Sequence, residues 1–246
     1  MARLFENQDG SDWAVLNCDD SNVWKLARSV RSRVFGFGFV PGGKPGIWPE
    51  GNALVFDMGS RRGRISLEGF RLPGRHNVSD AMAAAAGALA MFADERVIEQ
   101  TLRGFVGLPH RIELVHEQDG VKWIDDAKAT NVGAVVVALD AVVAPVILIA
   151  GGLDNGADYT PLIGPIHRKV KCAILNGGAR KNLAAMLTGA TQIELVPGLQ
   201  EAVERAAAIA RPGDTVLLSP ACSSFDQFRD YAELGDVFKE LVRAIP

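Results

Sequence analysis

Short apolar runs and helix-length segments alternate regularly from residue 109 to the end of the chain. The runs are rich in Val, Ile and Leu, as are strands that are buried on both faces of a sheet. We expect strands at residues 112–116, 121–124, 146–150, 172–175, 192–196 and 215–218. We expect helices from residue 131 onward and at residues 159–166, 179–187, 199–210 and 225–244. This alternation predicts βαβ units, and therefore an α/β fold with a parallel sheet covered by helices on both faces.

The first hundred residues lack that regular alternation. Strand patterns occur at residues 13–17, 33–37, 53–57, 64–67 and 69–72, and helix patterns at residues 21–30, 78–93 and 95–105. The pattern changes at Gly107-Leu108-Pro109, a typical loop sequence. We therefore expect one domain over residues 1–108 and a second over residues 109–246.

Composition argues against several classes of partner. The chain has 26 Lys and Arg against 29 Asp and Glu, so it lacks the basic surplus of a nucleic-acid-binding protein. Its three cysteines are far apart and odd in number, which fits a reducing cytoplasm rather than a disulfide framework or a zinc site. The N-terminal residues do not resemble a signal peptide, and Asp140 and Pro145 interrupt the apolar stretch 132–152. We expect a cytoplasmic protein without nucleic-acid or membrane partners.

Two glycine-rich segments are candidates for ligand-binding loops. Residues 38–44 have the spacing GxxxxGK of a phosphate loop, but Pro45 follows where a Ser or Thr would bind Mg²⁺, so a turn is favoured. Gly151-Gly152 ends an expected strand, where open α/β sheets bind ligands. Glycines required by a tight turn are an equally good interpretation there.

Polar residues before the Ala-rich helix and at the domain junction carry more chemistry. Residues 72–80 read Leu-Pro-Gly-Arg-His-Asn-Val-Ser-Asp. The amide of Asn77 can hydrogen-bond a purine edge, or it can cap the helix. Arg111 follows the junction, where its guanidinium can clamp a charged ligand.

A third segment, residues 123–131, reads Trp-Ile-Asp-Asp-Ala-Lys-Ala-Thr-Asn between an expected strand and an expected helix. Helix capping explains Thr130 or Asn131. It does not explain why Lys128 stands together with Asp126.

Together, these segments resemble the Mur ligases, specifically those of the MurD type, from end to end. The matching segments are residues 3–8, 14–20, 74–77, 107–113, 123–131 and 218–228. The last, Leu-Ser-Pro-Ala-Cys-Ser-Ser-Phe-Asp-Gln-Phe, is typical of MurD rather than of its sister ligases or folylpolyglutamate synthases. The resemblance implies part of a Mur ligase central ATPase domain in residues 1–108 and a Rossmann-like C-terminal domain in residues 109–246.

The resemblance also implies an activity, the ATP-dependent ligation of D-glutamate to UDP-N-acetylmuramoyl-L-alanine in peptidoglycan precursor synthesis. The substrate carboxylate attacks the γ-phosphate, and the amine of D-glutamate then displaces phosphate from the resulting acyl phosphate. Such a reaction depends on positioning and on neutralisation of charge by Mg²⁺ and protein cations.

Site residues follow from the family pattern. The resemblance implies that adenine contacts Asn77 and Asp80, the ribose contacts Asp126, and the phosphates contact Arg111. Substrate contacts are implied for Lys128, Thr130, Asn155, Ser224, Phe225 and Tyr231. Lys128 and Arg111 are the implied catalytic cations, Ser224 is expected at a helix N-terminus, and no metal ligand is expected in this chain.

The sequence departs from the family pattern in several places. No segment of residues 1–246 resembles the UDP-binding domain or the phosphate-loop half of the ATPase domain. Met1 stands where the family has a Lys whose carbamate supports Mg²⁺, and Asn155 stands where a Lys usually pairs with D-glutamate. Ala127 replaces a usual Ser, and Asp80 replaces a usual Asn. We therefore expect a truncated ligase that is inactive alone, with a separate N-terminal half as its partner if the gene is split.

Two rival functions remain open. A degenerate paralogue would be a non-catalytic module that keeps nucleotide or amino-acid binding. A nicotinamide-dependent dehydrogenase is disfavoured because no GxGxxG motif opens the second domain.

Overall fold

The structure, a computed structural model, describes residues 2–41, 43, 45–72 and 74–245. The chain divides into two compact units, Met1–Val106 and Gly107–Pro246, called here the N-terminal and C-terminal units.

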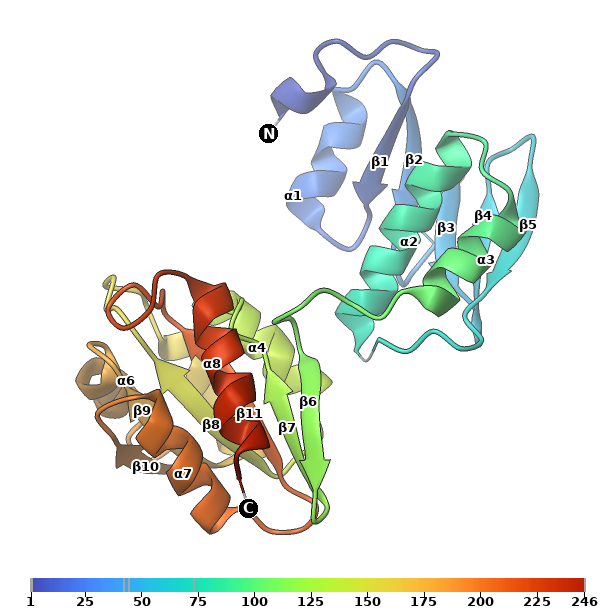
Figure 1. Ribbon diagram of the computed structural model, residues 1–246. Coiled ribbons are helices and arrows are strands. Elements are labelled where there is room, and N and C mark those ends of the chain that lie inside the picture. Colours follow the sequence, from blue (N-terminus) through green and yellow to red (C-terminus); the bar gives the residue numbers. More distant parts are fainter. Residues whose placement is uncertain (1, 42, 44, 73, 246) are drawn as a thin grey trace. The chain divides into compact units, whose positions relative to one another are not determined.

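The N-terminal unit is built on a mixed sheet (Figure 1). Its strands lie in the spatial order β1 (Trp13–Asn17), β2 (Arg33–Phe37), β3 (Gly46–Pro49), β4 (Ala53–Asp57) and β5 (Arg62–Ser66). The first three run parallel to one another, and β4 and β5 are each antiparallel to the strand before them.

Two helices cover this sheet. The Ala-rich α2 (Arg75–Ala90) packs on β1 to β3, and α3 (Glu95–Gly104) packs on β5. Small side chains let α2 lie close to the strands, and the core between them includes Phe35, Phe56 and Met82. Shorter elements complete the unit: η1 (Ala2–Phe5), α1 (Ser21–Trp24) and η2 (Lys25–Arg28).

Two local predictions for this unit were wrong, and one strand was missed. The helix expected over residues 21–30 is α1 followed by the 3-10 turn η2, which ends at Arg28. Residues 69–72 form no strand, because Gly69 adopts a left-handed φ of 78° that turns the chain. Strand β3 was not predicted. It contains Gly46 and Pro49, and its pairing with β2 and β4 places it in the sheet.

The C-terminal unit holds the second sheet. Its strands are β6 (Glu113–Gln118), β7 (Val121–Asp125), β8 (Val146–Gly151), β9 (Val170–Asn176), β10 (Gln192–Leu195) and β11 (Thr215–Ala221), in the spatial order β10-β9-β8-β11-β7-β6. Strands β7 to β11 are parallel, as predicted, whereas β6 is antiparallel to β7. Asp119 and Gly120, both with positive φ, form the tight turn that makes β6 and β7 a hairpin.

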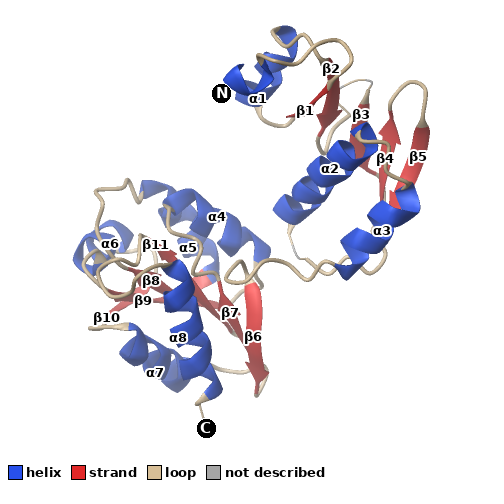
Figure 2. Ribbon diagram, turned by 45° about the horizontal axis from the view of Figure 1, so that its top comes forward, coloured by secondary structure: helices blue, strands red, loops and turns tan. Residues whose placement is uncertain are grey.

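Helices cover both faces of this sheet (Figure 2). One face packs against α4 (Val132–Ala141), α5 (Ile163–Lys169) and α6 (Arg180–Leu187), with η3 (Thr160–Leu162) before α5. The other packs against α7 (Leu199–Ile209) and α8 (Tyr231–Arg243). Alternate residues of β8 enter the two cores, Leu148 one and Ile147 the other. The fold is therefore α/β, with a doubly covered sheet.

Helix ends in this unit follow local capping. The side chain of Asn131 accepts a hydrogen bond from the backbone N–H of Ala134, so capping correctly explains Asn131. Helix α8 begins at Tyr231 rather than at Phe225, because Asp230 caps it through the N–H groups of Ala232 and Glu233. None of the helices in the described part of the chain has the length and apolarity needed to span a bilayer.

Candidate functional site

Most of the predicted site residues lie in the C-terminal unit, in loops that follow the carboxyl ends of its strands. Strands β9 and β11 lie on opposite sides of β8. From β8 the chain continues to β9 on one side, and from β10 it returns to β11 on the other side. Such a change of direction leaves the carboxyl ends of β8 and β11 open between their loops, where α/β sheets commonly bind ligands.

Asp126 directly follows β7, and its carboxylate is buried. Oδ2 accepts a hydrogen bond from the Ser219 hydroxyl (2.8 Å), and Oδ1 accepts one from the Ile112 N–H (3.3 Å). Burial raises the pKa of Asp126 to about 7, against the lowering effects of these hydrogen bonds and of Arg111; Asp125 adds to the rise. Asp126 is therefore poised between its neutral and charged forms near neutral pH.

Lys128 lies two residues further along the same loop and is half-buried. Its Nζ lies 3.8 Å from the centroid of the Tyr231 ring, a cation–π contact. The backbone N–H of Lys128 donates to the carbonyl of His110 (3.1 Å), and its own carbonyl accepts from Thr130 (2.8 Å). Lys128 thus contacts Tyr231 through its ammonium and Thr130 through its carbonyl, which brings together three of the residues predicted to lie around the substrates.

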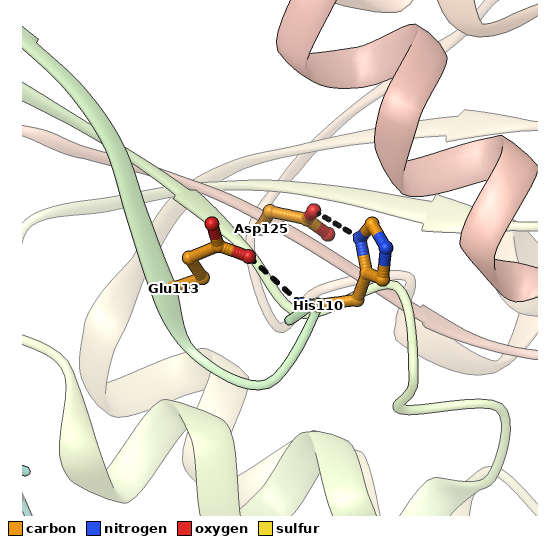
Figure 3. Close-up of side chains that lie close together, drawn as sticks. All are labelled: His110, Glu113 and Asp125. Atoms are coloured by element: carbon orange, nitrogen blue, oxygen red, sulfur yellow. Dashed lines mark hydrogen bonds and ion pairs between the residues drawn. The ribbon is translucent and has the colours of Figure 1, made fainter. Parts of the chain in front are cut away.

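A group of polar side chains, of which His110 and Asp125 are buried and Glu113 is half-buried, adjoins this loop, and sequence reasoning missed it (Figure 3). His110 Nδ1 lies 2.7 Å from Asp125 Oδ2, and the His110 N–H donates to Glu113 Oε2 (2.9 Å). These three side chains have metal-ligand chemistry. However, the Lys239 ammonium lies 2.8 Å from Glu113 Oε2 and 3.7 Å from Asp125 Oδ2. The Lys239 ammonium therefore already supplies the positive charge that a metal ion would bring to these carboxylates.

Lys239 also accounts for the ionisation of Glu113. Partial burial acts to raise the pKa of Glu113, but hydrogen bonds from Lys239 and the His110 backbone outweigh it and hold that pKa below its usual value. The carboxylate is therefore the charged partner of an ion pair.

Asn155 lies in the loop that follows β8, and it is exposed. Before it, Gly151 and Gly152 have φ values of 129° and 131°, and a β-carbon on either would collide with backbone oxygens of Asn176 or Ser223. This close packing supports the tight-turn interpretation of the two glycines.

Ser224 and Phe225 lie in the loop between β11 and α8. Ser224 is buried, while Phe225 is 67% exposed. The expectation that Ser224 opens a helix was wrong, because its carbonyl accepts from Gln227 and Phe228 in a separate turn.

A shallow open hollow lies between these two loops. Its polar lining includes Asn176, Ser224, Asp226 and Gln227. Asp226 accepts a hydrogen bond from the Gly178 N–H (3.0 Å), which ties the β11–α8 loop to the loop after β9. Of the predicted substrate residues, Ser224 alone is among the described residues lining this hollow.

The remaining predicted residues lie in the N-terminal unit. Asn77 and Asp80 are in the first turns of α2, Asn77 half-buried and Asp80 exposed. The helix begins at Arg75, so the N-cap position is Gly74 rather than Asn77. Burial lowers the pKa of the neighbouring His76, and the charge of Asp80 partly offsets this shift.

Met1 lies outside the described residues, and so do residues 42 and 44 of the GxxxxGK spacing.

Comparison with known families identifies one domain. Residues 110–222 match the family described as "Mur ligase, glutamate ligase domain".

Curated relatives extend the similarity over nearly the whole chain. It is 41% identical over 243 residues to a UDP-N-acetylmuramoylalanine–D-glutamate ligase of Geotalea uraniireducens, covering 99% of this chain and 54% of the relative. It is 42% identical over 255 residues to a protein of the same name from Myxococcus xanthus, with 99% and 55% covered. The chain thus spans about half the length of these relatives.

Solved structures agree on the fold. A MurF structure from Acinetobacter baumannii superposes with a TM-score of 0.69 at 14% identity, covering 98% of this chain and 54% of that one. A murein peptide ligase from Psychrobacter arcticus gives a TM-score of 0.63 at 13% identity, with 96% and 52% covered. At such low identity, these matches show the arrangement of the chain alone.

Proposed function

Because this chain is a homologue of the MurD-type Mur ligases, we propose that it takes part in joining D-glutamate to UDP-N-acetylmuramoyl-L-alanine with ATP. The observation that carries the proposal is the 41% identity along nearly the whole chain. Residues 1–246 match about half of each relative, so we propose that they supply the D-glutamate site and part of the nucleotide site. We propose further that they do not complete the reaction unaided.

The cluster after β7 fits such a role in the C-terminal unit. Asp126 would accept hydrogen bonds from ribose hydroxyls, for which each of its oxygens keeps a free lone pair beyond those used by Ser219 and Ile112. Arg111 is exposed and close enough to Asp126 to affect its pKa, and its guanidinium would pair with phosphate oxygens.

The substrate side of the proposal centres on Lys128. Its ammonium would neutralise negative charge on the acyl phosphate while the amine of D-glutamate attacks the acyl carbon and phosphate leaves. Thr130, Ser224, Phe225 and Tyr231 would contact D-glutamate. Asn77 and Asp80 would contact adenine.

Mg²⁺ does not fit the acidic group of this unit. The carboxylates of Glu113 and Asp125 already face the Lys239 ammonium, and a Mg²⁺ ion there would have to displace that cation. We therefore propose no Mg²⁺ ligand among the described residues.

A reconstitution experiment tests the proposal. ATP, UDP-N-acetylmuramoyl-L-alanine and D-glutamate are supplied to this chain, to the N-terminal half of a relative, and to a mixture of the two, and phosphate release is measured. We expect release that depends on D-glutamate in the mixture alone, lost with Lys128→Ala and kept with the exposed Lys181→Ala. Turnover by residues 1–246 alone would refute the proposal that they do not complete the reaction unaided.

One observation favours a second function, a non-catalytic binding module. Asn155 is an exposed amide where the family pattern has a lysine, so a positive charge expected beside D-glutamate is lacking. A mixture that binds D-glutamate but releases no phosphate would support the module over the ligase.

A further inference from the structure

The group formed by His110, Asp125, Glu113 and Lys239 has no part in the proposed substrate contacts, yet it adjoins both Lys128 and Tyr231. We propose that His110 and Asp125 are positioning residues that fix the place of the Lys128 ammonium. Two linkages join this buried pair to Lys128. The role of Lys128 toward substrate rests on the proposed function, but the linkages themselves do not.

The first linkage runs through the backbone. The His110 carbonyl accepts the N–H of Lys128 (3.1 Å), so the position of residue 110 sets the start of the Lys128 loop. His110 and Ile112 both have left-handed backbone angles, with φ of 62° and 48°. Non-glycine residues keep such angles only when their surroundings hold them. Asp125 holds the ring of His110, and Glu113 holds its N–H.

The second linkage runs through the rings. Asp125 Oδ1 accepts from the Ala127 N–H (2.9 Å), which orients Oδ2 toward Nδ1 of His110. The His110 ring meets the Tyr231 ring edge-on, with centroids 6.2 Å apart and planes at 77°. Lys128 Nζ lies over the face of the same Tyr231 ring. The ring of His110 thus fixes the aromatic surface on which the ammonium lies.

Helix α8 is docked on the pair by the face that carries Tyr231. Tyr231, Gly235 and Lys239 are spaced four residues apart and so share one face of the helix. A β-carbon at Gly235 would collide with the ring of His110 and lie 2.7 Å from Asp125 Oδ2, so the helix backbone itself closes over the pair. Lys239 then contacts Asp125 from the next turn.

Nuclear magnetic resonance of the whole chain tests the linkages without any need for activity. The methylene protons next to Lys128 Nζ should resonate upfield of those of other lysines, because they lie over the Tyr231 ring. Tyr231→Phe should keep this shift, and Tyr231→Leu should abolish it. Because a carboxylate can only accept, His110 should carry its proton on Nδ1. If the wild-type protein lacks either the upfield Lys128 shift or the proton on His110 Nδ1, the proposal is overturned, even if no variant folds.

Asp125→Asn is the decisive variant. Its amide can donate to Nδ1, so the proton of a neutral His110 should move to Nε2. The charge-assisted hydrogen bond then becomes a weaker neutral one, so the His110 ring should be held less firmly against Tyr231 and the upfield shift of Lys128 should fall. The matched control is Glu113→Gln, the same chemical change in the same group, which keeps an acceptor for the His110 N–H and should leave both signals unchanged. An unchanged Lys128 shift in folded Asp125→Asn protein would refute the positioning role.

The reconstituted mixture separates this inference from the proposed function. With ligation present, Asp125→Asn should lower kcat/KM for D-glutamate by roughly tenfold to a hundredfold, as small misplacements of catalytic groups do. If Asp125→Asn changes the Lys128 shift but the mixture shows no ligation, the positioning role is supported and the proposed function is refuted. If the mixture ligates and Asp125→Asn changes neither kcat/KM nor the Lys128 shift, the proposed function is supported and the positioning role is refuted.

Discussion

The hydroxyl of Ser219, in the inner strand β11, donates to Oδ2 of Asp126 across 2.8 Å, and Asp126 directly follows the adjacent strand β7. Both side chains are buried. The hydrogen bond stabilises the charged form of Asp126, while burial stabilises the neutral form more strongly. The balance between these two effects makes the protein sensitive to pH at this position.

Stability should fall as the pH rises through the range set by Asp126. Its pKa is about 7 in the folded protein and 3.8 as a reference for the unfolded chain. Between these values the unfolded state binds fewer protons than the folded state, so unfolding becomes easier with rising pH, by up to about 4 kcal/mol in total. Below pH 4 and above pH 7 this contribution should be level.

Asp126→Asn removes this titration. Urea unfolding at pH 5 and pH 8 should show the variant gaining stability relative to wild type at the higher pH. Asp158→Asn is the control, because Asp158 is exposed and should not change the difference between the two pH values. Equal pH dependence in Asp126→Asn and wild type would contradict a raised pKa.

Ser219→Ala should raise the pKa of Asp126 further, since it removes a hydrogen bond that lowers that pKa. Loss of a hydrogen bond to a charged group costs about 1.5–3 kcal/mol, so the variant should be destabilised at pH 8 and less so at pH 5. The side-chain carbon shift of Asp126, followed through a pH titration, measures the pKa directly. A pKa that falls or stays fixed would contradict this expectation.

The strands of the C-terminal unit were predictable because runs of apolar, β-branched residues indicate strands buried on both faces, regardless of which strands they pair with. Strand pairing is a different matter. The antiparallel β6 could have been predicted, because Asp119-Gly120 is a typical hairpin turn. Residues 69–72 and the start of α8 depend on one left-handed glycine and one capping aspartate, Gly69 and Asp230, which override the local apolar pattern.

The site was predictable only as far as its residues are close in sequence. Asp126, Lys128 and Thr130 lie in one segment, and their grouping follows from that. Lys239 lies 126 positions after Glu113, and no spacing rule connects them. Ser219 likewise lies 93 positions after Asp126, and the sequence does not indicate that its strand pairs beside β7 and brings the two side chains together.

The C-terminal unit should fold alone. Residues 107–246 contain a whole sheet with two cores of their own. The link before it is exposed, with Phe105 at 43% and Val106 at 79%, and so should be open to proteases. Limited proteolysis should leave a stable C-terminal fragment, and residues 107–246 expressed alone should unfold cooperatively. We also expect the N-terminal unit to be the less stable part. An N-terminal unit that is equally protected from digestion would contradict this expectation.

Asn155→Lys should strengthen binding of D-glutamate. The residue is exposed, so a lysine there adds charge without burying it. A charge-assisted hydrogen bond to a carboxylate contributes about 1.5–3 kcal/mol, or roughly tenfold to a hundredfold in affinity. Calorimetric titration with D-glutamate measures the gain, which should shrink as salt is added.

The matched control places the same charge on the same unit but away from the site. Gln192→Lys is exposed on β10 and should leave the affinity for D-glutamate unchanged. Neither variant should release phosphate without the half supplied by a relative, because a better amino-acid site acts on the second step and does nothing for transfer of the γ-phosphate. Equal gains from both lysines would mean that net charge rather than position 155 governs binding, and the assignment of Asn155 to the glutamate site would then fail.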